Sequence, residues 1–378
     1  LDLQLLSPLA AGADRLVARV ALELGIELIA VLPMEQSEYE RDFESADDLE
    51  AFRDILGQSK QTISLPLAGG LESAKPEPGS ALRDRQYAQL GLFISNHCQV
   101  LLALWDGHHS EAVGGTAQVV RYHLTSAMKG FVDTQASADL LADNENDLVY
   151  HIVCSREKHP RPPPQEMKLL ETFWITSLHG RQVGDDMPEE YRLMLVRLQE
   201  FDDDGEKYVA EIEAEGYTLL GDLPDMPLPS GVYEADLQYR EADWLAMHFQ
   251  KRVNFSLLTT YLLAATMGTI FLLYAEFDGP HWMVLFFLVL FFGGVVLHLI
   301  GERREWHRKY LDYRALAEGL RVQIYWNLAG VVNPASAGFA YDNFLNKQDV
   351  DRGWMRHVMR AVSMQRARGE APDPCWVE

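Results

Sequence analysis

The sequence is poor in positive charge. Its 378 residues include 33 Lys and Arg against 56 Asp and Glu, which gives a formal net charge of −23 at pH 7. Proteins that bind nucleic acids need a basic surface to meet the phosphate backbone. The composition therefore argues against nucleic acid as a partner, and an acidic surface of this kind mainly favours solubility.

Cysteine is also scarce. Cys98, Cys154 and Cys375 lie far apart and have no metal-ligand spacing, so we interpret them as reduced thiols and expect no metal. The sequence lacks an initiating methionine and a signal peptide and opens directly on a strand-like run. We therefore expect the natural N-terminus, with a first strand, to lie outside it.

Apolar runs alternate with helical patterns over residues 1–160, which we predict to be one domain. This alternation indicates an α/β domain with a Rossmann-like, doubly wound parallel sheet. We expect strands at 3–7, 27–32, 99–104 and 148–154, and helices at 14–24, 46–57, 83–95 and from the Gly-Gly-Thr turn to about residue 128.

A proline-rich stretch, "EKHPRPPPQ", closes this domain as a stiff exit. We interpret residues 161–232 as a connector, with a helix near 188–200, an acidic break "FDDDG" and another helix. Residues 233–378 are predicted to form a separate helical domain.

Two long runs without charge dominate the third region, at residues 253–274 and 280–300. A helix rises roughly 1.5 Å per residue, so each run is about 33 Å long, enough to cross a hydrocarbon core of about 30 Å. The alternative, a pair of buried helices in a soluble core, is disfavoured because neither run has a polar face. The short link "AEFDG" predicts a tight antiparallel transmembrane hairpin with the lipid bilayer as partner.

Charges beside the hairpin predict its orientation. Lys251 and Arg252 precede the first run, four basic residues between 303 and 309 follow the second, and the tip carries Glu276 and Asp278 but no base. The positive-inside rule then places both outer ends in the cytoplasm. We expect a multi-pass protein of the cell (inner) membrane whose N- and C-terminal domains are cytoplasmic.

The helices that leave the hairpin carry narrow apolar seams. Apolar residues recur at spacings of three and four from Ala235 to Val253 and from Trp306 to Ile324. Arg314 and Glu318 stand at i,i+4, a spacing that permits an ion pair. Such seams are equally typical of ordinary amphipathic helices that pack on their own domain and of an oligomerising stalk. We expect the two seams to pack together or against copies of themselves, in a homo-oligomer.

Small and hydroxyl residues lie within the apolar runs. Ala264 and Gly268 form a small-xxx-small pair that permits close helix contact. Ser256, Thr259 and Thr266 fall on one side of the first run, where they either line a wet path or bond to carbonyls of their own helix.

Two glycine-containing turns stand where predicted strands lead into helices. Gly12-Ala13-Asp14 follows the first strand, and Gly114-Gly115-Thr116 follows the strand at 99–104. Helix starts present unpaired N–H groups, and glycine lets an anion approach them. Two such turns at one sheet edge predict a site for a phosphate-bearing ligand. Taken singly, each turn is also explained by plain helix initiation, with Asp14 as N-cap and Arg15 on the surface.

The segment "LLSPLAAGADRLVARVALELGIELIAVLP" resembles the segment shared by DNA-processing (Smf) proteins, and "ALWDGHHSEAVGGTAQVV" resembles the phosphate-binding loop of the "lonely guy" enzymes. Together, over residues 1–155, they resemble the SLOG superfamily of nucleotide-binding domains. The resemblance implies a nucleotide-derived ligand, no other cofactor, and a ligand-binding set comprising Ser7, Gly12, Ala13, Asp14, Arg15, Asp106, Gly107, Gly114, Gly115 and Thr116.

The second motif departs from the hydrolytic members of that superfamily. Their catalytic glutamate corresponds to Val119, which cannot act as a general base, and Ala112-Val113 replace the usual proline-glycine. We therefore expect a sensor without catalytic residues. The alternative, a membrane-anchored nucleotide-processing (phosphoribohydrolase-like) enzyme, would have to use Glu111 or Asp106.

The C-terminal part resembles SLATT domains, two-span effector modules of prokaryotic conflict systems. "YREADWLAMHFQKR", the two apolar runs, "YRALAEGLRVQIYWNLAG" and "NKQDVDRGWMRHVMRAV" carry the likeness over residues 233–365. With the SLOG resemblance it implies a nucleotide-gated, pore-forming or membrane-disrupting effector in antiviral defence.

Overall fold

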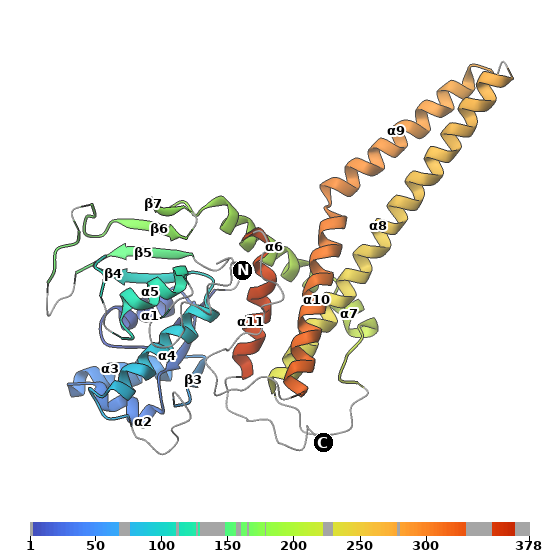
Figure 1. Ribbon diagram of the computed structural model, residues 1–378. Helices are drawn as coiled ribbons and strands as arrows, with labels where there is room; N and C mark the ends of the chain where they lie inside the picture. The colour runs from blue at the N-terminus through green and yellow to red at the C-terminus, as the bar shows by residue number, and fades with distance from the viewer. Residues whose placement is uncertain are drawn as a thin grey trace. The chain divides into compact units, whose positions relative to one another are not determined.

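The computed structural model describes residues 3–67, 76–110, 113–125, 128, 148–155, 160–164, 166–177, 179–221, 230–277, 280–329 and 350–366 (Figure 1). The chain divides into two compact units. The first unit comprises residues 1–200, 227–235 and 323–378, and the second comprises 201–226 and 236–322. The first is α/β with helical additions, and the second is helical.

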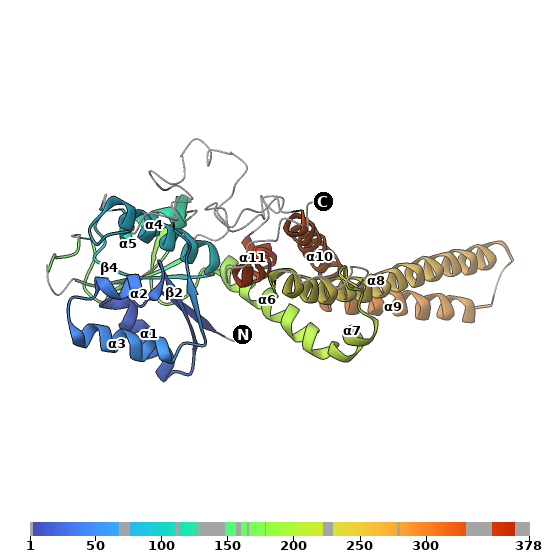
Figure 2. The same ribbon diagram turned by 90° about the horizontal axis from the view of Figure 1, so that it is seen from below.

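A small parallel sheet begins the first unit. β1 (Gln4–Ser7), β2 (Glu27–Leu32) and β3 (Gln61–Ser64) are parallel in the order β1-β2-β3. α1 (Ala13–Glu23) and α3 (Ala46–Gly57) lie on one side of β2, as Figure 2 shows. The predicted strand at 27–32 and helix at 46–57 are confirmed. Two short helical segments, α2 (Gln36–Tyr39) and η1 (Glu40–Asp42), follow β2.

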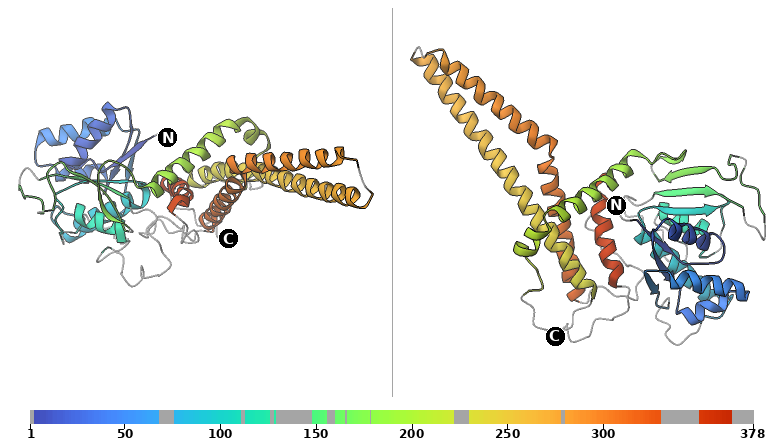
Figure 3. Two further views of the ribbon diagram at one scale, coloured as in Figure 1. Left: turned by 90° about the horizontal axis from the view of Figure 1, so that it is seen from above. Right: turned by 180° about the vertical axis from the view of Figure 1, so that it is seen from behind.

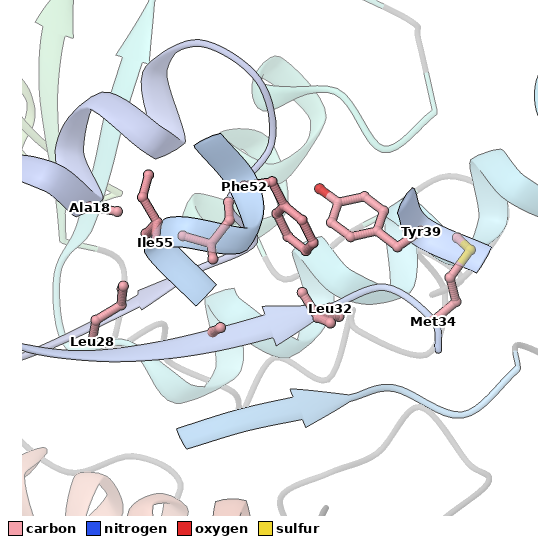
Figure 4. Close-up of a cluster of buried hydrophobic side chains, with 9 residues drawn as sticks. Ala18, Leu28, Leu32, Met34, Tyr39, Phe52 and Ile55 are labelled. Atoms are coloured by element: carbon pink, nitrogen blue, oxygen red, sulfur yellow. The ribbon is translucent and has the colours of Figure 1, made fainter. Parts of the chain in front are cut away.

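Alternation along β2 divides its side chains between two cores. Leu28, Ala30 and Leu32 pack with Ala18 of α1 and with Phe52 and Ile55 of α3 (Figure 4). Ile29 and Val31 pack on the other face with Leu90 and Phe93 of α4 (Ala81–His97). Because successive side chains of a strand point to opposite faces, a fully apolar strand needs helices on both sides. That requirement explains why "ELIAVL" is a central strand.

A second sheet contains the later strands. β4 (Leu101–Trp105) and β5 (Val149–Val153) are parallel, and β6 (Thr172–Thr176) and β7 (Gly180–Val183) continue the sheet antiparallel. The described strands thus form two sheets, where the sequence predicted one doubly wound sheet. Residues 172–183 extend this sheet past the predicted domain boundary at 160. Ile94 of α4 packs against cores of both sheets.

The acidic stretch "FDDDG" does not interrupt a helix, which corrects the prediction. α6 (Glu189–Lys207) continues through it, and α7 (Val209–Glu215) follows. Asp204 is buried and accepts hydrogen bonds from Lys309 Nζ, at 2.6 Å, and Tyr313 Oη, at 2.7 Å. Partners distant in sequence therefore stabilise helical aspartates that local preference disfavours.

The two predicted seams pack against each other within the chain. α8 (Ser230–Glu276) and α10 (Trp306–Leu328) bury Leu245, Phe249, Tyr313 and Leu320. The rings of Phe249 and Tyr313 meet edge to face, 5.7 Å apart. Arg314 forms an ion pair with Asp243 at 2.8 Å, and the predicted ion pair between Arg314 and Glu318 is also present, at 2.6 Å.

The apolar runs lie in α8 and in α9 (Trp282–Arg303), which run side by side (Figure 3). Both helices are long and apolar enough to cross a membrane, and no part of their most apolar windows is buried. Thr259 and Thr266 donate to the carbonyls of Phe255 and Leu262, each at 2.8 Å. These hydroxyls are therefore satisfied within their own helix.

The chain returns to the first unit after the hairpin. α11 (Trp354–Arg366), preceded by the short helix η3 (Val350–Arg352), packs against α4. Gln323 Nε2 donates to the carbonyl of Met359 at 3.1 Å, and Arg197 pairs with Asp351 at 2.5 Å. The first unit thus includes C-terminal residues that the sequence assigned to a separate domain.

Candidate ligand-binding site

The first turn joins β1 to α1. Gly12 is the N-cap of α1 with φ 99° and ψ −120°, and it supplies no side-chain cap to the helix start. Only glycine adopts such a backbone without strain. Ser7 is buried, and its hydroxyl accepts from the Leu9 amide at 3.3 Å and donates to the Asp14 carbonyl at 3.5 Å. The start of α1, from Ala13 onward, therefore keeps uncapped donors, while Ser7 holds the turn in shape.

Asp14 and Arg15 have different environments. Burial raises the pKa of Asp14 to about 6, with a smaller opposing contribution from a hydrogen bond to the Ala10 backbone. Arg15 is buried and donates to the carbonyl oxygen of Asp48 at 2.7 Å and to its Oδ1 at 2.6 Å. Its guanidinium also lies 5.6 Å from the centre of the Phe43 ring. Arg15 thus joins α1 to α3 and is not the surface residue that the simpler interpretation expected.

The second turn begins at Asp106, after β4. Asp106 Oδ1 accepts from the His108 amide at 3.0 Å, and Gly107 has φ 78°. His108 Nε2 lies 2.8 Å from the carbonyl oxygen of Pro162. These contacts fix the beginning of the loop against the proline-rich segment. Glu111, the other acidic candidate, lies outside the described residues.

The Gly-Gly-Thr part of this turn already has an internal partner for one donor. The Gly114 amide donates to Gln118 Oε1 at 2.7 Å. Gly114 has φ 76°, and a Cβ there would lie 2.7 Å from Tyr87 Cβ and 3.1 Å from the Ala88 nitrogen. Gly115 accepts from the amides of Gln118 and Val119 at 2.9 and 3.1 Å, and α5 (Thr116–Thr125) begins at the next residue.

Two tyrosines connect the turns. Tyr39 Oη donates to the Pro8 carbonyl of the first turn at 3.1 Å. The Tyr39 and Tyr87 rings meet at 6.4 Å with an angle of 62°, and Gly114 lies directly on Tyr87. The two predicted turns are therefore linked through a pair of aromatic side chains. The sequence predicted both turns at one sheet edge, but the described strands β1 and β4 belong to different sheets, and the turns are joined through these side chains instead.

An ion pair between Arg83 and Asp42, which the sequence did not predict, holds Tyr87 in place. Arg83 is 2% exposed and donates from Nε to Asp42 Oδ2 at 3.0 Å and from Nη2 to the Glu38 carbonyl at 2.7 Å. Tyr87 Oη donates to the same oxygen of Asp42. Burial raises the pKa of both Tyr39 and Tyr87 above the usual value. The available signal was the i,i+4 spacing of Arg83 and Tyr87 on one helix face.

Val119 lies in a packed apolar environment. A Cβ on Gly91 of α4 would lie 2.5 Å from Val119 Cγ2, and Val119 also borders the core of the second sheet. Val119, which the sequence resemblance aligned with a catalytic glutamate, is thus a side chain used for helix packing.

The described residues offer no metal centre. Within them, no group of three or more His, Cys, Asp or Glu side chains is arranged to hold an ion. Cys98 and Cys154 are free thiols, and burial raises the pKa of Cys98 to about 12. Cys375 lies outside the described residues. An open surface hollow lies along α3, between Ala46 and Asp54, and includes neither turn.

Comparison with known proteins gives one match. A family model described as "Protein of unknown function (DUF4231)" matches residues 238–332, which include most of α8, all of α9 and all of α10. No curated protein and no solved structure matched the chain. The part of the chain that carries the apolar hairpin is thus similar to a family whose description assigns no activity.

Proposed function

We propose that this protein is a membrane effector in which an N-terminal domain binds a nucleotide-like ligand and controls a transmembrane hairpin. The observation that carries this proposal is that no residue in the most apolar windows of α8 and α9 is buried. Large apolar side chains, among them Phe271, Leu285 and Phe292, are 61%, 64% and 62% exposed. Such a surface is unstable in water and is suited to lipid.

The backbone and hydroxyl bonding of the hairpin support insertion. In lipid, every polar backbone group needs an internal partner, which a continuous helix supplies. Thr259, Thr260, Thr266 and Thr269 donate to carbonyls four residues earlier, at 2.8 to 2.9 Å. The hairpin can therefore enter hydrocarbon without unpaired hydroxyl donors at these four positions.

Basic side chains lie at the open end of the hairpin and favour a cytoplasmic base. Lys251, Arg303 and Arg304 are exposed there. Arg252 donates to Tyr208 Oη at 3.2 Å, and its guanidinium lies 5.8 Å from the centres of both the Phe249 and Trp306 rings. Aromatic and basic residues together are typical of a membrane–water interface.

The two turns are the proposed ligand site, and several chains would share the gating work. A shift from 1:99 to 99:1 between two states needs about 5.5 kcal/mol of differential binding. This differential binding free energy is large for a single site, whereas in a homo-oligomer each of several bound ligands contributes a part of it. Opening would produce a pore or disrupt the bilayer, as the SLATT resemblance implies for antiviral effectors.

Purified full-length protein in liposomes tests the proposal. AMP, ADP and ATP are added separately, and thermal stability, dye release and nucleotide breakdown are measured. We expect one nucleotide to stabilise the protein and cause dye release without being consumed. Consumption would instead support the nucleotide-processing enzyme, and the absence of any response in all three assays would contradict the ligand-gated function.

A charged substitution tests the membrane assignment separately. Leu290→Arg places a charge near the middle of α9, where insertion costs about 2.5–3.5 kcal/mol more. Leu169→Arg is the matched control, because Leu169 is 56% exposed and lies outside both apolar runs. We expect only Leu290→Arg to reduce membrane recovery, and equal recovery of both variants would contradict a spanning hairpin.

A further inference from the structure

The outer face of α1 is apolar. Leu16 and Val20 of this helix, and Leu24 directly after it, are 58%, 46% and 70% exposed. Their spacing of four places them in one row along the helix. The opposite side of α1 buries Ala18 and Ala21 in the first unit. α1 thus has apolar residues on two faces, whereas a surface helix of a monomer has a polar outer face.

Two opposite charges border this row on one side. Arg19 and Glu23 are both exposed, and neither forms an ion pair within the part of the chain that the structure describes. At about 100° per residue they lie beside Leu16 and Val20, on the edge away from Ala18 and Ala21. The face therefore consists of an apolar row with a basic and an acidic group along the same edge.

The face is complementary to itself. In an antiparallel pair related by a twofold axis, corresponding edges of the two helices face each other. Centred near Val20, such a pair places Leu16 of one copy against Leu24 of the other. It also brings Arg19 of each copy next to Glu23 of the other. A parallel pair would place like charges at the same level.

We propose that the outer face of α1 binds the same face of a second copy of this chain, antiparallel, through Leu16, Val20 and Leu24 with Arg19–Glu23 pairs at the rim. An 11-residue helix offers less than the roughly 800 Å² per partner of a typical stable interface. The contact is therefore weak in dilute solution, and co-residence of chains in one bilayer raises their effective concentration.

This pairing goes beyond the proposed function, because it assigns the surface through which copies meet and does not require a ligand. It also places the contact on the helix whose first residues form the Gly12–Asp14 turn. The pairing and the ligand function are separable: a dimer that forms without nucleotide response supports the pairing alone.

Cysteine cross-linking of the full-length protein in liposomes tests the pairing. The native cysteines Cys98, Cys154 and Cys375 are replaced by serine, and Val20→Cys is introduced on the proposed twofold axis. Glu50→Cys, exposed on the neighbouring helix α3, is the matched control. We expect Val20→Cys to form disulfide-linked dimers at least tenfold faster under mild oxidation, and equal rates would overturn the proposal.

Charge reversal checks the antiparallel arrangement. Arg19→Glu and Glu23→Arg are each combined with Val20→Cys and should slow cross-linking severalfold, because like charges then face each other across the axis. The double reversal should restore the rate. Circular dichroism verifies that the variants fold. Failure of the double reversal to restore cross-linking would contradict the antiparallel arrangement.

Discussion

The two glycine turns differ in whether their backbone N–H groups already have hydrogen-bond partners. The first turn, at Gly12, opens α1 with no side-chain cap, and the space around Gly12 is open. The second turn, at Gly114, donates to Gln118 and lies tightly on Tyr87 and Ala88. An anion can approach the first turn directly, whereas at the second it competes with an existing hydrogen bond. The two turns have similar sequences but differ in how many backbone donors are free to bind an anion.

This difference assigns separate roles to the two turns. In the proposed function, the uncapped N–H groups and the positive end of the α1 dipole would make the first turn the primary anion site. The second turn becomes a conditional site, in which displacement of the Gln118 amide accompanies binding. A conditional contact suits a sensor, because a ligand shifts an equilibrium only through unequal affinity for two states.

Alanine at the two glycines should produce the largest contrast. Gly114→Ala adds strain at positive φ and pushes Cβ into helical backbone that cannot move, so we expect a loss of about 3–5 kcal/mol of unfolding free energy. Gly12→Ala adds strain alone and should cost about 1–3 kcal/mol. Urea unfolding measures both, and a larger loss for Gly12→Ala would contradict the packing difference between the turns.

Asp14 gives the first turn a pH dependence. Its folded-state pKa of about 6 exceeds the usual 3.8, so the folded protein binds this proton more tightly than the unfolded chain. The associated stability is complete below about pH 4 and is lost as pH rises through about 6. Relative to Asp14→Asn, wild type should therefore lose about 1–3 kcal/mol between pH 4 and 7.

The measurement is the unfolding free energy of both proteins at several pH values. The difference between them removes the contribution of the many other carboxylates. Protonation of Asp14 also removes a negative charge from the start of α1, so binding of inorganic phosphate should strengthen below pH 6 in wild type only. A pH-independent difference between the two proteins would contradict the buried position of this carboxyl group.

Local signals explain how much of the fold could be predicted. Ser45 caps α3 by accepting from the Asp48 amide, and the continuous run "ELIAVL" matches a strand covered on both faces. β3 and β7 were missed because "QTIS" and "GRQV" carry no alternating apolar pattern, and β6 was missed because its apolar run lies in the stretch interpreted as a connector. The helical course of "FDDDG" depends on Lys309 and Tyr313, about 100 residues away, and no local rule contains that information.

The candidate site was predictable only in part for the same reason. Glycine and helix-start chemistry locate both turns, since these are local properties of the chain. The Tyr39–Tyr87 contact and the Arg83–Asp42 ion pair join segments about 40 to 50 residues apart. Arg15 illustrates the limit, because the simpler interpretation placed it on the surface, and packing instead buries it with a hydrogen bond to Asp48.

Removal of the Gln118 amide should loosen the second turn and favour binding. Gln118→Ala leaves the Gly114 donor without its partner, and a typical loss is about 1 kcal/mol of unfolding free energy. If a ligand uses that donor, its affinity should rise a few-fold because nothing competes. Calorimetry with AMP, ADP and ATP measures this, with Gln58→Ala at the C-cap of α3 as a control for an exposed glutamine. A weaker affinity would mean that Gln118 itself contacts the ligand.

Arg15→Lys should have the smallest effect. Lysine lacks the planar fork that reaches both the carbonyl and Oδ1 of Asp48, so we expect a loss of about 0.5–1 kcal/mol in unfolding free energy. Nucleotide affinity should change less than twofold, because the guanidinium is directed at α3. Asp48→Asn should have a similar effect on stability. A large loss of affinity in Arg15→Lys at unchanged stability would instead assign Arg15 to the ligand, as the SLOG resemblance implies.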